Sequence, residues 1–166
     1  MADAALLELS IKLGHVLKAR GWTLALAESC TGGWVSQTVT AVAGSSAWFD
    51  RGFVTYSNTA KQEMLGVTPK TLDAHGAVSM ETALEMALGA LKHSHANITA
   101  AITGIAGPDG GSPEKPVGMV CFAWATDKGL SKSTTLYLSG GREHVRQESV
   151  KTVLEGLLQL TLSTDL

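Results

Sequence analysis

An apolar run that stops abruptly at a polar turn is the feature that most constrains how this chain folds. Residues Leu24–Ala27 are all apolar, and the run ends at Glu28 and Ser29. Two glycines follow within Thr31–Gly33, and an amphipathic segment, Trp34–Val42, comes next. This order predicts a buried strand, a tight turn and the start of a helix. Unpaired backbone N–H groups gather at the positive end of a helix dipole, so such a turn can hold a phosphate or a developing oxyanion.

The polar residues of this turn also have a simpler interpretation. Serine and threonine are preferred helix caps whether or not they take part in chemistry. Ser29 or Thr31 can therefore be present only to cap the helix that follows, and the local pattern leaves both interpretations open.

Helical and strand-like patterns alternate along the chain, and a hairpin pattern follows near its end. A buried strand pattern with apolar residues throughout, 98–105, is expected to lie in the centre of the sheet. We expect helices over 6–17 (closed by Gly21), 31–42, 58–65, 80–91 and 140–162, a turn or short helix over 69–75, and strands over 22–27, 48–56, 98–105, 117–125 and 131–138. This order predicts a single α/β domain over 1–166, a three-layer α/β/α sandwich with a mixed sheet.

Composition excludes several classes of protein. Hydrophobic residues make up 45% of the chain and charged residues 17%, which is typical of a globular domain. A formal net charge of -2 gives no general attraction to nucleic acid or to an anionic membrane, so neither partner is expected. No apolar run reaches the roughly 20 residues of a membrane span, and residues 1–8 lack the pattern of a signal peptide. Cys30 and Cys121 form neither a metal-binding spacing nor a disulfide framework, which favours buried free thiols in the cytoplasm.

Polar segments that contain glycine follow several of the predicted strands. They cover residues 28–33, 55–61, 103–116 and 139–142. Ligand sites in such sheets gather at the carboxyl ends of strands. We therefore expect these segments to form one pocket.

Familiar catalytic motifs are absent from the sequence. It has no Walker A pattern, no dinucleotide-binding fingerprint and no G-x-S-x-G elbow. The histidines are scattered, and His93 and His95 lack a carboxylate-rich neighbourhood, so we expect surface residues and no metal site. Residues Ser112–Lys115 match S-x-x-K by chance, since they lie in a loop rich in glycine and proline.

Lys61 is a candidate general base. It follows Thr55–Asn58, with Asn58 as the expected helix cap, and so lies in the first turn of a predicted helix. The positive end of the dipole, together with burial, would lower the pKa of a lysine there and make a neutral amine available. A solvated lysine on a helix surface is the alternative.

Arg142 and Arg146 lie one helical turn apart after Ser139–Gly141. Two guanidinium groups near backbone N–H groups are suited to holding a phosphate, and Arg142 is the preferred ligand because it lies closer to the glycine turn. The alternative is an exposed basic face that neighbouring glutamates partly neutralise.

Several motifs occur together in the order known from one family. They are Ala27-Glu-Ser-Cys-Thr-Gly-Gly33, Val54-Thr-Tyr-Ser-Asn58 with Lys61, His75-Gly-Ala-Val-Ser79, Thr103-Gly-Ile-Ala-Gly-Pro108 and Lys115-Pro-Val-Gly118. Over about residues 5–162 the chain resembles the C-terminal domain of the competence-damage-inducible CinA proteins. That family also includes stand-alone nicotinamide-nucleotide amidases, which this chain resembles more than the longer CinA proteins.

The resemblance implies hydrolysis of nicotinamide mononucleotide to nicotinate mononucleotide and ammonia, in pyridine nucleotide recycling. It implies a serine–lysine mechanism without metal or other cofactor, in which Ser29 is the nucleophile and Lys61 the general base. Tyr56 would assist proton transfer or orient the lysine. A small-molecule nucleotide is the expected partner, and we also expect a homo-oligomer. The substrate-binding residues implied are Thr31, Gly32, Gly33, Thr103, Gly104 and Arg142, with the N–H groups near 31–33 stabilising the oxyanion.

Two other interpretations fit the same residues. Glycine loops and an arginine are equally compatible with a non-catalytic nucleotide-binding or regulatory module, and the Ser29–Lys61 pair is what favours an enzyme. A second enzymatic interpretation makes Cys30 the nucleophile, although its side chain is expected to point toward the core, away from Ser29.

Overall fold

A computed structural model describes residues 3–163, so residues 1–2 and 164–166 of the predicted domain lie outside the described part. The elements run in the order α1 (Ala4–Arg20), β1 (Leu24–Glu28), α2 (Trp34–Thr40), η1 (Ser45–Ala47), β2 (Phe49–Val54), α3 (Asn58–Leu65), α4 (Pro69–His75), α5 (Met80–Lys92), β3 (Ile98–Gly104), β4 (Met119–Thr126), β5 (Ser131–Tyr137) and α6 (Arg142–Ser163). The predicted alternation of helices and strands is confirmed, as is the late hairpin of β4 and β5.

The strands form one mixed sheet in the order β2-β1-β3-β4-β5. Strand β1 pairs in parallel with both β2 and β3, whereas β4 runs antiparallel to β3 and β5. The apolar strand β3 occupies the centre, as the sequence predicts, and its first six residues are buried.

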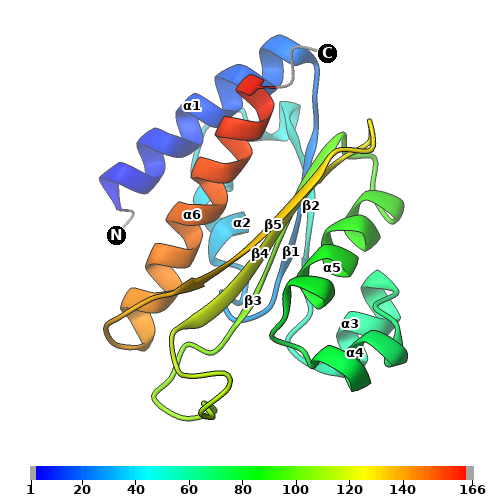
Figure 1. The fold of residues 1–166 in the computed structure, drawn as a ribbon. Coiled ribbons are helices and arrows are strands. Elements are labelled where there is room, and N and C mark those ends of the chain that lie inside the picture. The colour runs from blue at the N-terminus through cyan, green and yellow to red at the C-terminus, as the bar shows by residue number, and fades with distance from the viewer. Residues whose placement is uncertain (1–2, 164–166) are drawn as a thin grey trace.

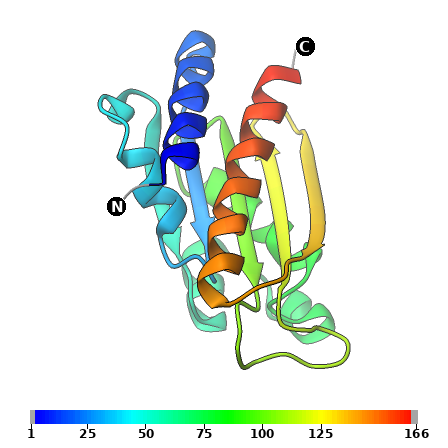
Figure 2. The same cartoon turned by 90° about the vertical axis from the view of Figure 1, so that its left-hand side faces the viewer.

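Helices cover both faces of this sheet, which confirms the three-layer α/β/α sandwich. Helices α1, α2 and α6 lie on one face, and α3, α4 and α5 lie on the other (Figures 1 and 2). The side chains beneath them form two separate apolar clusters, one around Leu26 and Leu154 and the other around Met86 and Ala101. The sheet therefore lies between two cores. The polar loops follow the carboxyl ends of the parallel strands, at one edge of the sheet.

Two local predictions were wrong at helix starts. Helix α2 begins at Trp34 rather than residue 31, because Gly32 and Gly33 have φ angles of 59° and 103°, which a right-handed helix does not contain. Helix α3 is capped by Ser57, whose side chain accepts a hydrogen bond from the Ala60 N–H, so Asn58 is already the first helical residue.

A helix that crosses a lipid bilayer must be both long and apolar. None of the helices within residues 3–163 combines the length and apolarity that a membrane crossing requires.

Candidate active site

The pairing register of the parallel strands brings three polar segments to the same level. Glu28, the last residue of β1, lies opposite Val54 of β2 and Ile102 of β3. The ladder continues one step further, since the Ser29 N–H donates to the Ile102 carbonyl at 3.0 Å and the Thr55 N–H to the Glu28 carbonyl at 2.8 Å. Ser29 therefore leaves the sheet beside the chain segments that follow β2 and β3.

A pocket of about 280 Å³ opens at this edge of the sheet. Its lining comes from all the segments that the sequence predicts to converge, with a further contribution from the loop before α5. The lining residues are Ser29, Cys30, Tyr56, Asn58, Lys61, Ala77, Val78, Thr103, Gly104, Ile105, Ala106, Gly107, Asp109, Gly110 and Arg142. The predicted convergence on one pocket is confirmed.

Ser29 and Lys61 both line the pocket, and their side chains are within hydrogen-bond distance of each other. The Lys61 Nζ lies 3.0 Å from the Ser29 Oγ and donates to the Thr55 carbonyl at 2.9 Å. The lysine is only 2% exposed, and no carboxylate in residues 3–163 forms an ion pair with it. Burial lowers the pKa of Lys61 below its ordinary value of 10.5. The arrangement can therefore supply a neutral amine within hydrogen-bond reach of a serine hydroxyl.

Glu28 is fully buried and organises the turn that carries Ser29. Its Oε1 accepts from the Thr31 hydroxyl at 2.7 Å and from the Val35 N–H at 2.9 Å. Its Oε2 accepts from the N–H and the hydroxyl of Ser36 at 2.9 and 2.7 Å. Because Gly33 has no side chain to cap α2, this carboxylate satisfies N–H groups that open the helix and lies at the positive end of its dipole.

The turn at residues 31–33 therefore differs in detail from the predicted phosphate- or oxyanion-binding turn. The Thr31 hydroxyl is bonded to Glu28, and the Gly32 N–H donates to the Ser29 carbonyl at 3.0 Å. Thr31, Gly32 and Gly33 do not contribute to the lining of the Ser29 pocket. Their substrate-binding roles stay predictions, and the structure shows them shaping the turn.

Arg142 and Arg146 have different surroundings, although they lie one turn apart on α6. Arg142 lies at the pocket and donates to the Gly107 carbonyl at 2.8 Å and to the Tyr56 hydroxyl at 3.1 Å. Arg146 instead donates to the carbonyls of Cys30 and Thr31, each at 3.1 Å. Of the two arginines, only Arg142 lines the pocket and can contact a ligand there.

Tyr56 and Thr103 border the Ser29–Lys61 pair in different ways. The Tyr56 side chain is 63% exposed, and its hydroxyl is paired with Arg142 rather than with Lys61. The Thr103 hydroxyl donates to the Ala77 carbonyl at 2.8 Å and so joins the end of β3 to the loop before α5. At the next residue, Gly104, a side chain would contact Val120 at 2.9 Å, which explains why glycine fits there.

Cys30 is buried, and its thiol packs in the core cluster beneath α2. Burial raises its pKa to about 12, so the nucleophilic thiolate is scarce near neutral pH. This environment disfavours the interpretation of Cys30 as the nucleophile.

Sequence reasoning did not assign the roles of Glu28 and Arg146. A carboxylate at the end of an otherwise apolar buried run was the available signal for Glu28, since a buried charge needs several hydrogen-bond partners. Asn58 and Asp109, which also line the pocket, carried no comparable signal.

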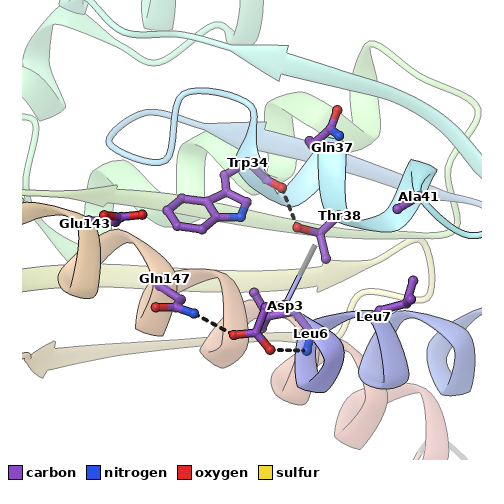
Figure 3. Close-up of a pocket in the computed structure, with 9 residues that line it drawn as sticks. All are labelled: Asp3, Leu6, Leu7, Trp34, Gln37, Thr38, Ala41, Glu143 and Gln147. Atoms are coloured by element: carbon purple, nitrogen blue, oxygen red, sulfur yellow. Dashed lines mark hydrogen bonds between the residues drawn. The ribbon is translucent and has the colours of Figure 1, made fainter. Parts of the chain in front are cut away.

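A second cavity, of about 590 Å³, lies between α1, α2 and α6 (Figure 3). It is lined by Asp3, Trp34, Glu143 and Gln147 among others, and Gln147 donates to the Asp3 carboxylate. It shares no lining residue with the Ser29 pocket. Within residues 3–163, no group of three or more metal-ligating side chains comes together.

The fold agrees with what comparison with known proteins finds. The chain belongs to the CinA C-terminal domain family, whose sequence profile matches residues 7–161. It is 54% identical over 159 residues to the nicotinamide-nucleotide amidohydrolase PncC of Escherichia coli strain K12, covering 96% of both chains. A protein of the same name from Enterobacter agglomerans is 50% identical over 159 residues, or 96% of this chain and 97% of the relative.

A solved structure supports the same assignment. The competence/damage inducible protein CihA from Agrobacterium tumefaciens superposes with a TM-score of 0.94 at 46% identity, covering 96% of this chain and 98% of that one. The family resemblance predicted from the motifs is confirmed.

Proposed function

We propose that this chain is an amidohydrolase that converts nicotinamide mononucleotide to nicotinate mononucleotide and ammonia, with Ser29 as nucleophile and Lys61 as general base. The 3.0 Å separation of Lys61 Nζ and Ser29 Oγ in a buried pocket is the observation that carries the proposal. The similarity to nicotinamide-nucleotide amidohydrolases over nearly the whole chain supports the choice of substrate.

The reaction begins with transfer of a proton from the Ser29 hydroxyl to the neutral amine of Lys61. The Ser29 Oγ bonds to the carboxamide carbon, and the carbonyl electron pair moves to oxygen to form a tetrahedral oxyanion. Lys61 then returns the proton to the leaving nitrogen, the C–N bond breaks, and ammonia departs. Water, deprotonated in turn by Lys61, hydrolyses the nicotinoyl ester and restores Ser29.

The remaining pocket residues hold the nucleotide. Arg142 retains N–H groups beyond those that bond Gly107 and Tyr56, and its guanidinium provides a charged partner for the phosphate. Binding the phosphate at a distance from Ser29 positions the carboxamide for attack. Tyr56 orients Arg142 through their hydrogen bond.

Cellular location and assembly are parts of this proposal. Free buried thiols at Cys30 and Cys121 support a reducing cytoplasm. A homo-oligomer is expected, and size-exclusion chromatography with light scattering measures it directly.

Ammonia release from nicotinamide mononucleotide by the purified chain tests the proposed function. The parent is expected to turn over, whereas Ser29→Ala is expected to bind nucleotide without turnover. Nucleotide binding by the parent with no ammonia release would favour the alternative, a non-catalytic nucleotide-binding module.

A further inference from the structure

The peptide groups that follow Ser29 are held by a residue outside the pocket. Arg146 of α6 donates from Nε to the Cys30 carbonyl and from Nη2 to the Thr31 carbonyl, each at 3.1 Å. Its guanidinium carbon also lies 5.2 Å from the ring centroid of Trp34, the first residue of α2. Arg146 is not among the residues that line the Ser29 pocket. The two hydrogen bonds and the aromatic contact together fix the position of the guanidinium fork.

These hydrogen bonds determine where the neighbouring N–H groups point. In a trans peptide the C=O and the N–H point in opposite directions. Within residues 3–163 only the Gly107–Pro108 bond is cis. The Thr31 N–H therefore points away from Arg146, because Arg146 holds the Cys30 carbonyl of the same peptide group. The Cys30 N–H likewise points away from the Ser29 carbonyl, which accepts from the Gly32 N–H.

Neither of these two N–H groups has a hydrogen-bond acceptor on another described residue. The Ser29 N–H, in contrast, donates to Ile102, and the first N–H groups of α2 donate to Thr31 and Glu28. Of these two residues only Cys30 lines the Ser29 pocket, whereas Thr31 is fully buried outside it, so the Cys30 N–H is the donor available beside Ser29. Backbone N–H groups with no internal partner beside a nucleophile are what an oxyanion requires.

We propose that Arg146 is a positioning residue for the hydrolysis, because it fixes the turn that presents the Cys30 N–H to the oxyanion formed on Ser29. Arg146 holds the Thr31 carbonyl, whose peptide group carries the Gly32 N–H, and that N–H donates to the Ser29 carbonyl of the peptide group that carries the Cys30 N–H. This inference rests on the proposed amidohydrolase function. As the Ser29 Oγ bonds to the carboxamide carbon, the carbonyl oxygen gains the electron pair and accepts a hydrogen bond from the Cys30 N–H. Arg146 itself touches neither substrate nor the reacting atoms.

Substitution of Arg146 separates positioning from a general structural role. We expect Arg146→Met to lower kcat by about 10- to 100-fold, less than the 10²- to 10³-fold loss that removing an oxyanion donor itself causes. The KM and the affinity for nicotinate mononucleotide are expected to change by less than about threefold, because Arg146 lies outside the pocket. Arg146→Lys is expected to stay near the Arg146→Met rate, since a single ammonium does not reproduce the fork that spans two carbonyls. Lys151→Met, on an exposed part of the same helix, is the matched control and keeps the parent kcat.

A second measurement does not depend on the natural substrate. A fluorophosphonate probe modifies an active serine through an intermediate whose phosphoryl oxygen uses the same oxyanion donors. The rate constant for modification of Ser29 is expected to fall in Arg146→Met by the factor seen in kcat. Melting temperatures of all variants, measured in parallel, report any loss of folded protein.

The outcomes test the role of Arg146 and the proposed substrate separately. Arg146 variants with kcat and modification rate within twofold of the parent would overturn the positioning role. A loss of kcat matched by loss of product binding and a lower melting temperature would also overturn it. If the parent reacts with the probe but does not hydrolyse nicotinamide mononucleotide, the substrate proposal fails, and the modification rates still decide the role of Arg146. A parent whose Ser29 neither reacts nor turns over would overturn both.

Discussion

Replacing Glu28 by glutamine tests whether the buried carboxylate stabilises the turn that carries Ser29. Glutamine has nearly the same shape but exchanges one carboxylate oxygen for an NH₂ group. The amide oxygen can keep the bonds from the Thr31 hydroxyl and the Val35 N–H. The NH₂ group would face the hydroxyl and the backbone N–H of Ser36, which both donate to Glu28 in the parent. The hydroxyl can rotate and accept a hydrogen bond instead, but the backbone N–H can only donate.

The hydrogen bonds of Glu28 set the expected loss in the free energy of unfolding. One charge-assisted hydrogen bond, worth about 1.5–3 kcal/mol, is lost, and the partly buried Ser36 N–H is left without an acceptor. Loss of the negative charge at the N-terminus of α2 removes about 0.3–1 kcal/mol more. Glutamine also avoids the free-energy cost of burying a charge, which acts in the opposite direction. That cost is small here because donors from three residues already bond the carboxylate. We expect a net loss of about 2–3 kcal/mol.

At about 2–4 °C per kcal/mol for a chain of this size, the melting temperature is expected to fall by about 4–12 °C. Thermal unfolding followed by circular dichroism, together with urea denaturation, provides the measurement. Glu8→Gln is the control, because the Glu8 side chain is 70% exposed, and its effect is expected to stay within about 0.5 kcal/mol. Equal melting temperatures for Glu28→Gln and Glu8→Gln would refute the argument that the carboxylate stabilises the turn.

Further predictions concern the pocket. Lys61→Arg is expected to lower kcat by about 10²–10⁴-fold, and parent turnover is expected to rise with pH through an ionisation below 10.5, because the neutral amine is the base; near-normal turnover by Lys61→Arg would exclude the base role. Lys61→Met is expected to raise the melting temperature at pH 7, with an advantage that shrinks toward pH 10.5. The sign follows because the folded-state pKa is the lower one, so the parent gains stability between that pKa and 10.5. Arg142→Ala is expected to raise KM for the mononucleotide by about 10- to 150-fold, equivalent to about 1.5–3 kcal/mol, but to leave nicotinamide riboside little affected; equal losses on both would exclude a phosphate contact. Cys30→Ala is expected to keep turnover within about threefold, and inactivation of the parent by iodoacetamide at pH 8 that Cys30→Ala escapes would reopen the thiol interpretation.

The sheet and the position of the pocket could be predicted from the sequence because their signals are local. The apolar run of residues 98–105 predicts a central strand, and the polar residues after each strand predict a shared edge. The Ser29–Lys61 pairing was inferred from motif order, since nothing in the spacing of 29 and 61 fixes the distance between their side chains. The register of β1 with β2 determines that distance.

The roles of Glu28 and Arg146 depend on partners that no local pattern reveals. Arg146 lies one turn after Arg142 on the same helix, and proximity to the glycine turn favours Arg142 as the pocket ligand, but no local pattern predicts that Arg146 bonds the carbonyls of the turn at residues 30–31. Only the packing of α6 against the turn at residues 30–31 directs one guanidinium to backbone carbonyls and the other to the pocket. The start of α2 shows the same limit, since the expected helix began at residue 31, whereas two glycines with positive φ delay it to Trp34.

The continuation of the strand ladder through Ser29 and Thr55 has a consequence for the thermal behaviour of the enzyme. Ser29 and the Thr55 carbonyl that holds Lys61 are attached to hydrogen bonds of the central sheet, which are expected to open only with the whole domain. Arg142 and Tyr56, in contrast, are exposed and exchange conformations without opening the sheet. On warming toward the melting temperature, nucleotide affinity is therefore lost first, whereas the rate of the chemical step persists until the fold itself is lost.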